Sequence, residues 1–224
     1  SGLQSYRQAL AVTGQNIANI NTDGYKRRDA TLEEVATGQS GINSTGNTPG
    51  LGVRVGEIRR AFDEFLLNKA RSSTAYAEST ATFSTSIKQL EALILPGEAN
   101  LGAAIGRLFT GLQEIASTPN DMAARTVALE QAKQMADTFT ETASLIETYM
   151  EGLITQANEQ IAGVNVLTNE IASLNRQLAT ASGTKPNNAL LDSRDALIDK
   201  LSKLVEVNVD LTDKGVALVT LGGN

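Results

Sequence analysis

Apolar residues recur every three or four positions over residues 3–20, and this spacing predicts a first helix with one apolar face. Asn, Asp and Gly in residues 21–24 predict its end, because Asn and Gly tolerate the left-handed backbone of a C-cap and Asp-Gly favours a tight turn. The chain that leaves this turn is expected to be extended. Residues 36–52, rich in Gly, Ser, Thr and Asn, are expected to form a loop, and Val and Ile among polar residues over 53–58 predict a short strand.

Three helical segments are predicted next, over residues 62–95, 99–117 and 122–181. In the third, apolar or small residues from Phe139 to Leu178 recur at steps of three and four, close to the 3.5-residue period of a coiled coil. No Pro interrupts this segment, so its roughly sixty residues would extend for about 90 Å. A compact domain of this chain length would have a diameter of only about 40–50 Å. We therefore predict a rod containing one unbroken helix.

The C-terminal part of the sequence changes its period. Asn187 or Asn188 is expected to cap a fourth helix over residues 189–204. Residues 205–221 alternate between apolar and polar on both sides of an Asp-Lys-Gly turn, which predicts a β-hairpin. Because two strands alone are marginally stable in water, we expect this hairpin to begin a larger β-rich domain.

The predicted fold is mainly α. It is an elongated bundle of long antiparallel, coiled-coil-like helices, with a short β segment near residues 51–60 and the start of a β-rich domain at the C-terminus. Gly102 and Gly106 are expected to allow close helix packing. The expected segments are a helix with an Asn-rich turn (1–31), a Gly/Ser/Thr-rich loop with a short strand (32–61), a rod-like helical domain (62–204) and the start of the β-rich domain (205–224).

The composition argues against several kinds of function. The 224 residues include 19 Lys and Arg against 25 Asp and Glu, a net charge of −6, and nucleic-acid binding is not expected because phosphate requires a basic face. The chain has no Cys and no His, so it lacks a thiolate nucleophile, a thiolate metal site and an imidazole base. No apolar run is long enough to span a membrane. Residues 1–4 show neither an initiator Met nor a signal peptide, and we expect the chain to begin inside an element.

Asp192, Asp195 and Asp199 share one face of the fourth predicted helix. They could bind a cation, but calcium sites wrap their ligands around a tight turn, and negative charge near a helix N-terminus is favourable without any ligand. The basic residues that lie near them in the sequence are Arg194, Lys200 and Lys203. We therefore expect a structural role for these aspartates, with no metal and no cofactor. An enzyme is not expected, since no Gly-x-Ser-x-Gly motif or supported Ser-x-x-Lys motif is present.

Residues 16–27 read Asn-Ile-Ala-Asn-Ile-Asn-Thr-Asp-Gly-Tyr-Lys-Arg. This stretch resembles the N-terminal signature of the bacterial flagellar axial proteins, the rod, hook and hook-associated proteins, in which a helix ends in an Asn-rich turn followed by Gly-Tyr. The resemblance implies a role in assembly for a turn motif that consists of Asn16, Asn19, Asn21, Gly24 and Tyr25. We expect Gly24 to adopt a positive φ. Tyr25 is expected to pack either on the helical bundle or on a neighbouring subunit, and we favour the neighbour.

Three further stretches, residues 61–71, 119–125 and 186–195, make the chain similar to the hook-associated junction members of that family. The last stretch contains a helix-start motif with Asp192, Arg194 and Asp195. Rod and hook proteins would be expected to enter β-structure soon after the first helix, whereas most of this chain is predicted as long helices. The first few residues of the family and its C-terminal helices, which return to pair with the N-terminal ones, have no counterpart in this sequence.

The resemblance implies a structural protein of the bacterial flagellum, an adaptor at the hook–filament junction that assembles helically by lateral and axial self-association. The implied partners are other copies of itself in a helical ring, the hook protein, the second junction protein (hook-associated protein 3) and an export chaperone, with no nucleic acid and no membrane. The implied location is extracellular, in the flagellum, after export through the flagellar secretion channel without a cleavable signal peptide. A rod or hook subunit of the same apparatus and an unrelated coiled-coil interaction protein remain alternatives.

Overall fold

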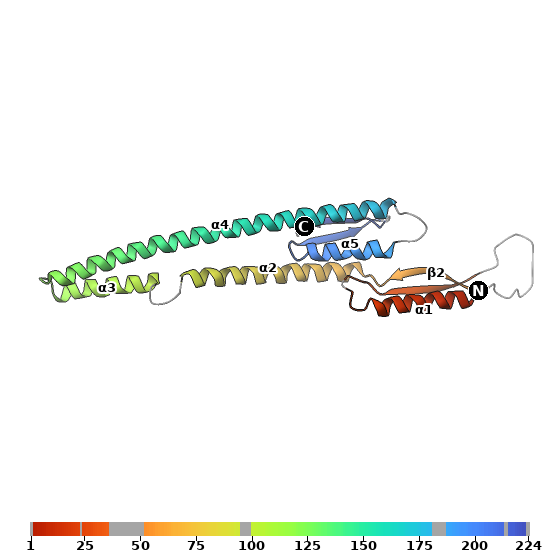
Figure 1. Ribbon diagram of the computed structural model, residues 1–224, viewed down its shortest axis with the longest axis horizontal. Coiled ribbons are helices and arrows are strands. Elements are labelled where there is room, and N and C mark those ends of the chain that lie inside the picture. The colour runs from red at the N-terminus through yellow and green to blue at the C-terminus, as the bar shows by residue number, and fades with distance from the viewer. Residues whose placement is uncertain are drawn as a thin grey trace, which may run out of the picture. The chain divides into compact units, whose positions relative to one another are not determined.

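The computed structural model describes residues 2–22, 24–35, 52–94, 100–180, 187–212 and 215–222. These residues form helices and two two-stranded antiparallel sheets (Figure 1), β1 paired with β2 and β3 with β4. In chain order the elements are α1 (Gly2–Ala18), β1 (Arg28–Glu34), β2 (Val53–Arg60), α2 (Glu64–Ile94), α3 (Leu101–Ser117), α4 (Met122–Thr180), α5 (Asn188–Leu201), β3 (Val207–Leu211) and β4 (Ala217–Leu221). The prediction of a mainly α fold is confirmed.

The chain divides into two compact units. Unit 1 contains residues 1–76 and 164–224, and unit 2 contains residues 77–163. Helices α2 and α4 each contribute residues to both units. The four segments expected from the sequence therefore do not coincide with these units.

Most predicted elements are present with small changes at their ends. Helix α4 continues without a break from Met122 to Thr180, as its seam and its lack of Pro predict. Helix α5 ends at Leu201, three residues before the predicted end, and the next residues form turns. The extended segment after the first turn is a strand, β1, which the sequence analysis did not predict as such. Residues 36–51 of the predicted loop over 36–52 lie outside the described residues, as do residues 182–186 of the turn before α5 and residues 213–214 of the predicted hairpin turn.

Side-chain caps explain where the helices begin. The Oδ1 atom of Asn187 accepts a hydrogen bond from the Leu190 backbone N–H at 3.3 Å, so Asn187, rather than Asn188, caps α5. Asn100 caps α3 in the same way through the Ala103 N–H, at 2.8 Å. Each cap satisfies a backbone donor that has no partner within its own helix.

Unit 1 contains an apolar core. Its buried members come from α4, α5, β3 and β4 and are Ile171, Ile198, Leu201, Val207, Val209 and Ala217. The hairpin alternates as predicted, but its apolar face packs on α4 and α5 (Figure 1). The described strands thus complete this core, because the apolar face of a two-stranded sheet needs a cover. The expectation that they also begin a larger β-rich domain stays a prediction.

Unit 2 is packed through small residues. The buried residues among those described in unit 2 are Ala104 and Gly111 of α3 and Ala124 and Ala128 of α4. A Cβ built at Gly111 would lie 3.3 Å from the Ala128 Cα, so these two helices approach closely. The predicted close-packing pair is wrong, since a Cβ at Gly106 would meet nothing within 4 Å and one at Gly102 would meet only the Asn100 cap.

The apolar seam of α4 is buried more completely in one of its two parts. In unit 1, Val164 and Leu167 pack against the core around Ile171. In unit 2, Met150 and Ile161 of the same seam remain 56% and 59% exposed. The apolar face of α1 is also exposed, at Leu3, Tyr6, Leu10 and Ile17, as is Ile20 in the turn that follows. Within the described ranges, no helix combines the length and the hydropathy that crossing a bilayer requires.

Candidate functional site: the Asn-rich turn on helix α5

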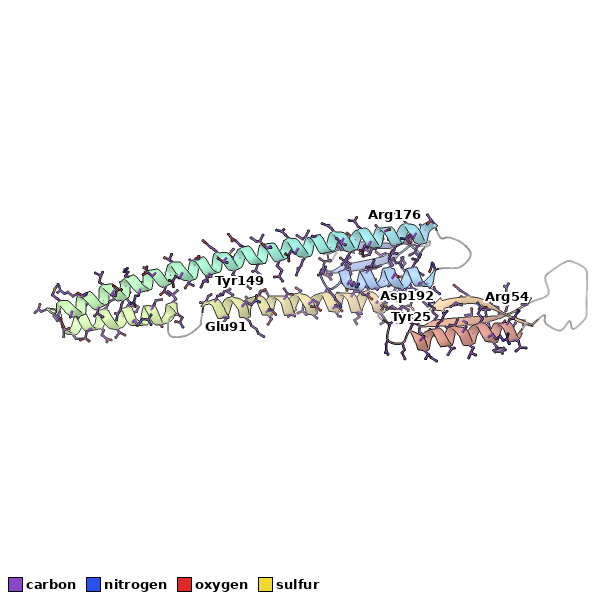
Figure 2. All side chains as sticks on the ribbon, in the orientation of Figure 1. Tyr25, Arg54, Glu91, Tyr149, Arg176 and Asp192 are labelled. Atoms are coloured by element: carbon purple, nitrogen blue, oxygen red, sulfur yellow. The ribbon has the colours of Figure 1, made fainter. Side chains whose placement is uncertain are left out.

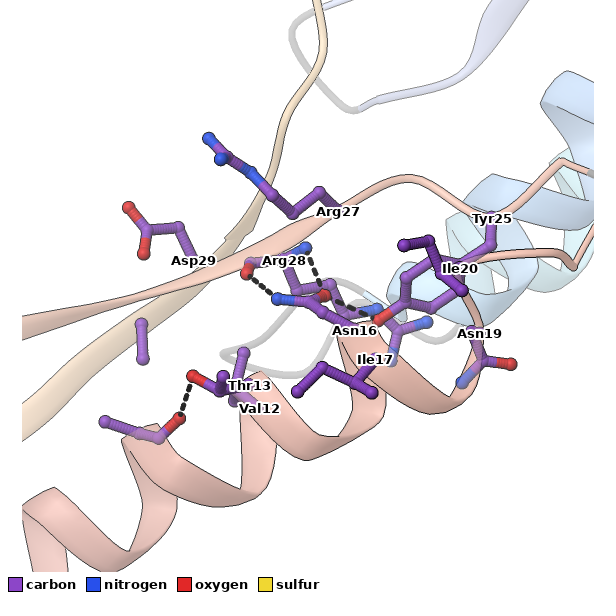
Figure 3. Close-up of a pocket in the computed structure, with 12 residues that line it drawn as sticks. Val12, Thr13, Asn16, Ile17, Asn19, Ile20, Tyr25, Arg27, Arg28 and Asp29 are labelled. Carbon is purple, nitrogen blue, oxygen red and sulfur yellow. Dashed lines mark hydrogen bonds between the residues drawn. The ribbon is translucent and has the colours of Figure 1, made fainter.

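The side chain of Asn16 joins the end of α1 to the start of β1 (Figure 3). Its Nδ2 donates to the Arg28 carbonyl oxygen at 2.8 Å, and its Oδ1 accepts from the Arg28 backbone N–H at 2.9 Å. One side-chain amide therefore satisfies both backbone polar groups of Arg28, as a neighbouring strand would. The same Oδ1 accepts a hydrogen bond from the Tyr25 hydroxyl at 2.8 Å.

Short-range hydrogen bonds close the turn after α1. The Asn19 Nδ2 donates to the Gln15 carbonyl at 2.9 Å, and its Oδ1 accepts from the Thr22 hydroxyl at 3.2 Å. The Tyr25 backbone N–H donates to the Thr22 carbonyl at 3.2 Å. Gly24 has a φ of +77°, the left-handed conformation that the sequence predicts for it.

The turn rests against the middle of α5. A Cβ built at Gly24 would lie 2.9 Å from the Ala196 Cβ, so the close approach requires glycine on one side and a small residue on the other. A groove of about 460 Å³ lies beside this contact, with Tyr25 among its lining residues on the turn and Asp192 among those on α5 (Figure 2). Two motifs that are far apart in the sequence thus meet in unit 1.

Two arginines, at the start of β1 and at the end of β2, contact the aspartates of α5. Arg28 Nη2 lies 3.3 Å from Asp192 Oδ2, and Arg60 Nη1 lies 3.0 Å from Asp192 Oδ1 and 2.7 Å from Asp195 Oδ2. The side chains of Arg60, Asp192 and Asp195 are 7%, 11% and 3% exposed. At such burial, loss of one charge leaves its partner without a counterion, which is far more costly than at an exposed site.

A second ion pair and a buried arginine flank this group. Arg71 Nε, on α2, lies 2.7 Å from Asp199 Oδ1. Arg194 is 1% exposed, and its Nη1 donates to the Gly215 carbonyl at 2.6 Å, which ties α5 to β4 at its start. Burial lowers the pKa of the Arg194 guanidinium, and the nearby carboxylate of Asp195 opposes this shift.

The structure brings most of the predicted site residues together. Asn19, Gly24 and Tyr25 of the turn motif line one groove with Asp192 of the helix-start motif, and Asn16 is hydrogen-bonded to Tyr25. Asn21 is exposed in the turn, and Arg194 supports the hairpin β3–β4 rather than the turn. Within this chain, the Tyr25 ring lies 5.1 Å from the Arg28 guanidinium and its hydroxyl bonds to Asn16, while packing of Tyr25 on a neighbouring subunit stays a prediction.

Local sequence patterns did not reveal the arginines that connect the two motifs. Of the expected partners Arg194, Lys200 and Lys203, only Arg194 contacts one of these aspartates, at 3.8 Å from Asp195. The other observed partners are Arg28, Arg60 and Arg71. The 3-and-4 spacing of the aspartates did indicate one shared face, but no local pattern identifies partners so distant in the sequence. Over the described ranges, no group of three or more acidic residues is arranged to hold a metal ion.

Two family models match different parts of the chain. The model of the flagella basal body rod protein matches residues 1–26, which include α1 and the turn, and that of the flagellar hook-associated protein FlgK helical domain matches residues 87–224. Together they define the class as a flagellar structural protein. The second match covers more than half of the chain, and the chain therefore belongs to the family of the flagellar hook-associated protein FlgK.

Individual relatives agree with this family. The chain is 30% identical to flagellar hook-associated protein 1 of Bacillus subtilis (strain 168), over 95% of the chain and 43% of the relative. It is 28% identical to flagellar hook-associated protein 1 of Salmonella typhimurium (strain LT2), over 99% of the chain and 40% of the relative. The chain thus spans less than half the length of these curated relatives. It is also similar to the structure of the flagellar hook junction protein FlgK from Burkholderia pseudomallei, with a TM-score of 0.62 and 30% identity over 69% of this chain and 27% of that one.

Proposed function

We propose that this chain is part of a structural subunit of the bacterial flagellum that acts as an adaptor at the hook–filament junction. It assembles with other copies of itself in a helical ring by lateral and axial contacts. Its neighbours in the assembly are the hook protein and the second junction protein, hook-associated protein 3. It performs no catalysis and uses no cofactor.

One observation carries this proposal. The segment that matches rod proteins and the segment that matches the FlgK helical domain meet in unit 1, where Gly24 packs against Ala196, and Tyr25 and Asp192 line the same groove. An N-terminal segment shared with rod proteins suits a subunit that continues the axial structure of the flagellum. A helical domain shared with junction proteins suits a position at the end of the hook.

This combination favours the junction over a rod or hook subunit. The rod-protein match is confined to residues 1–26, whereas the FlgK helical-domain match extends over residues 87–224. An unrelated coiled-coil protein would have no reason to match both models. We also propose that the protein reaches the outside of the cell through the flagellar secretion channel, without a cleavable signal peptide and with the help of an export chaperone.

The test uses the full-length protein in cells that lack their own hook-associated protein 1. We expect the protein to restore filaments and swimming, and antibody labelling of isolated flagella to place it between hook and filament. Labelling along the rod or the hook, or no labelling of flagella, would contradict the proposal.

Two variants test whether the turn takes part in assembly. In Gly24→Val and Tyr25→Ala, export, helicity and motility are measured separately. Normal export and helicity without attached filaments would support an assembly role for the turn. Normal filaments and swimming in both variants would restrict the turn to folding within one chain.

A further inference from the structure

Helix α1 and strands β1 and β2 form one internally connected segment, which we call the N-terminal arm (residues 2–35 and 52–60, as far as they are described). The Asn16 amide ties α1 to the start of β1. At the other end of α1, the Ser5 hydroxyl donates to the Val53 carbonyl at 2.7 Å, on β2. Val12 is buried between these two ties. Because its parts are connected at both ends, the arm can move as one body.

The arm is attached to the rest of unit 1 by ion pairs and hydrogen bonds rather than through the apolar core. None of its residues belongs to the buried apolar core around Ile198. Within the described residues, the side-chain polar contacts from the arm to the rest of unit 1 all reach α5, while one backbone hydrogen bond, from the Ala61 N–H to the Arg27 carbonyl at 2.7 Å, lies where the arm continues into α2. The side-chain contacts are the pairs of Arg28 and Arg60 with Asp192 and Asp195, and a hydrogen bond of 3.0 Å from Asn188 Nδ2 to the Ile58 carbonyl. Polar interfaces of this kind permit relative motion more readily than large apolar ones.

The two arginines of this interface lie directly opposite each other in the sheet. Arg28 and Arg60 are partners in the register of β1 and β2, at the end of this strand pair nearest α5. Like charges in directly opposed positions destabilise a strand pair. Asp192 resolves the conflict, because one of its carboxylate oxygens contacts Arg28 and the other contacts Arg60. The repulsion between the two arginines at this end of the β1–β2 pair is therefore compensated only when α5 supplies this carboxylate.

We propose that Arg28, Arg60, Asp192 and Asp195 form a charge clasp that fixes the orientation of the N-terminal arm on α5. Opening the clasp releases the arm as one body and leaves the apolar core of unit 1 intact. Arg60 is the central positioning residue, since its Nη1 contacts both aspartates at 3.0 and 2.7 Å. For assembly, the inference rests on the proposed function, because the arm contains the segment that matches rod proteins.

Because positive charges outnumber negative ones around the clasp, neutralising an aspartate and neutralising an arginine should have different effects. With the adjacent Arg194, three guanidinium groups lie near two carboxylates, Asp192 and Asp195. Neutralising a carboxylate therefore enlarges a positive excess at a buried place, while neutralising Arg28 removes it. A purely structural role for these side chains, through shape and packing, predicts no such difference.

Hydrogen–deuterium exchange of the full-length protein tests the clasp. In Asp192→Asn, we expect exchange in β1 and β2 to accelerate at least about tenfold, while β3, β4 and α5 stay within about twofold of the parent. Arg28→Gln alone is expected to accelerate exchange in β1 and β2 less than Asp192→Asn does, because Arg60 still pairs with both aspartates. Arg28→Gln added to Asp192→Asn is expected to recover much of the lost protection, because it removes the repulsion across the hairpin. Asp210→Asn, at an exposed position on β3, is the control for loss of an aspartate.

Three outcomes would overturn the proposal. Exchange that accelerates equally in the arm and in the core would show that the arm is not separable. Unchanged exchange in Asp192→Asn would show that the clasp does not hold the arm. Further loss of protection on adding Arg28→Gln would contradict the charge balance. Because these measurements need no flagellum, they can fail while labelling still places the protein at the junction, and they can succeed where that labelling fails.

Discussion

Units 1 and 2 share two long helices but are packed on different principles. The buried apolar residues of unit 1 include Ile171, Ile198 and Leu201, together with the inner faces of β3 and β4. Those of unit 2, among the described residues, are alanines and a glycine on α3 and α4. Large side chains in unit 2 remain exposed, among them Phe109 at 66% and Leu129 at 73%. The comparison shows that one continuous helix, α4, can be a core element at one end and a largely uncovered one at the other.

The difference follows from what each stretch of helix meets. Apolar burial stabilises by about 25 cal/mol per Å² of area removed from water, so only the stretch covered by α5 and the hairpin gains much from it. In unit 2, close helix approach through Ala and Gly gives contact between backbones but removes little apolar area from water. We therefore expect unit 1 to dominate the stability of this chain.

Truncation of the unit 1 core should have the largest effect. Leu201 is fully buried, so Leu201→Ala should lower the free energy of unfolding by about 2–5 kcal/mol through lost burial and a residual cavity. Leu145→Ala, at a half-exposed position of α4 in unit 2, should cost less than about 1 kcal/mol. Urea unfolding followed by circular dichroism measures both, and equal losses would contradict the comparison.

A charge in the α4 seam should distinguish the two parts of the helix. Leu167 is partly buried and packs against the unit 1 core, so Leu167→Asp should cost about 3 kcal/mol because it places an unpaired carboxylate against that core. Leu153, at the seam position two heptads earlier in unit 2, is also partly buried but has no such core beside it, and Leu153→Asp should cost about 1 kcal/mol. Thermal melts decide the matter, since a larger drop for Leu153→Asp would mean that unit 2 is the better packed unit.

Two glycines of α3 should respond with opposite sign. Gly111→Ala places a methyl group against the Ala128 backbone and the Gln131 side chain and should destabilise by about 1–2 kcal/mol. Gly106→Ala meets no neighbouring atom and should stabilise α3 by up to about 1 kcal/mol through its higher helix propensity. Chemical denaturation of the two variants side by side checks this, and the same sign in both would refute close packing at Gly111.

The smallest effect is expected in the N-terminal arm. Asn16→Asp keeps the acceptor for the Arg28 N–H and the Tyr25 hydroxyl but loses the donor to the Arg28 carbonyl, at a cost of about 1 kcal/mol. Asn21→Asp makes the same chemical change at an exposed position and should have almost no effect. Amide exchange at the start of β1 provides the readout, and matching behaviour of the two variants would argue against the Asn16 tie.

The sequence predicted the elements of this fold better than their packing. Periodicity and breakers identified α1, α2, α3, α4, α5 and the C-terminal hairpin, because these features depend on neighbouring residues. The same reasoning could not show that the hairpin covers α4 and α5, since the alternation of residues 205–211 defines an apolar face but not its partner. It also chose the wrong glycines on α3, because Gly102 and Gly106 share a spacing that only the position of α4 could confirm.

In the candidate site, too, local patterns predicted individual features but not their partners. The positive φ of Gly24 and the shared face of Asp192 and Asp195 follow from local rules, and both are observed. The partners of those aspartates, Arg28 and Arg60, lie at the ends of two strands whose pairing no short pattern reveals. Arg28 and Arg60 flank the extended segment after the first turn and the predicted strand over 53–58, and this is the one signal that could have pointed to a bridging carboxylate.

The docking of the Asn-rich turn on α5 is the central claim, and a cysteine pair tests it most directly. The chain contains no Cys, so Thr22→Cys and Ser193→Cys, which both line the groove between the turn and α5, introduce the only thiols. We predict that a short bifunctional maleimide links them efficiently within one chain. Replacing Ser193→Cys by Thr220→Cys, on β4, should abolish the link. Linking that is absent in the first pair, or equally efficient in both pairs, would contradict the docking of the turn on α5.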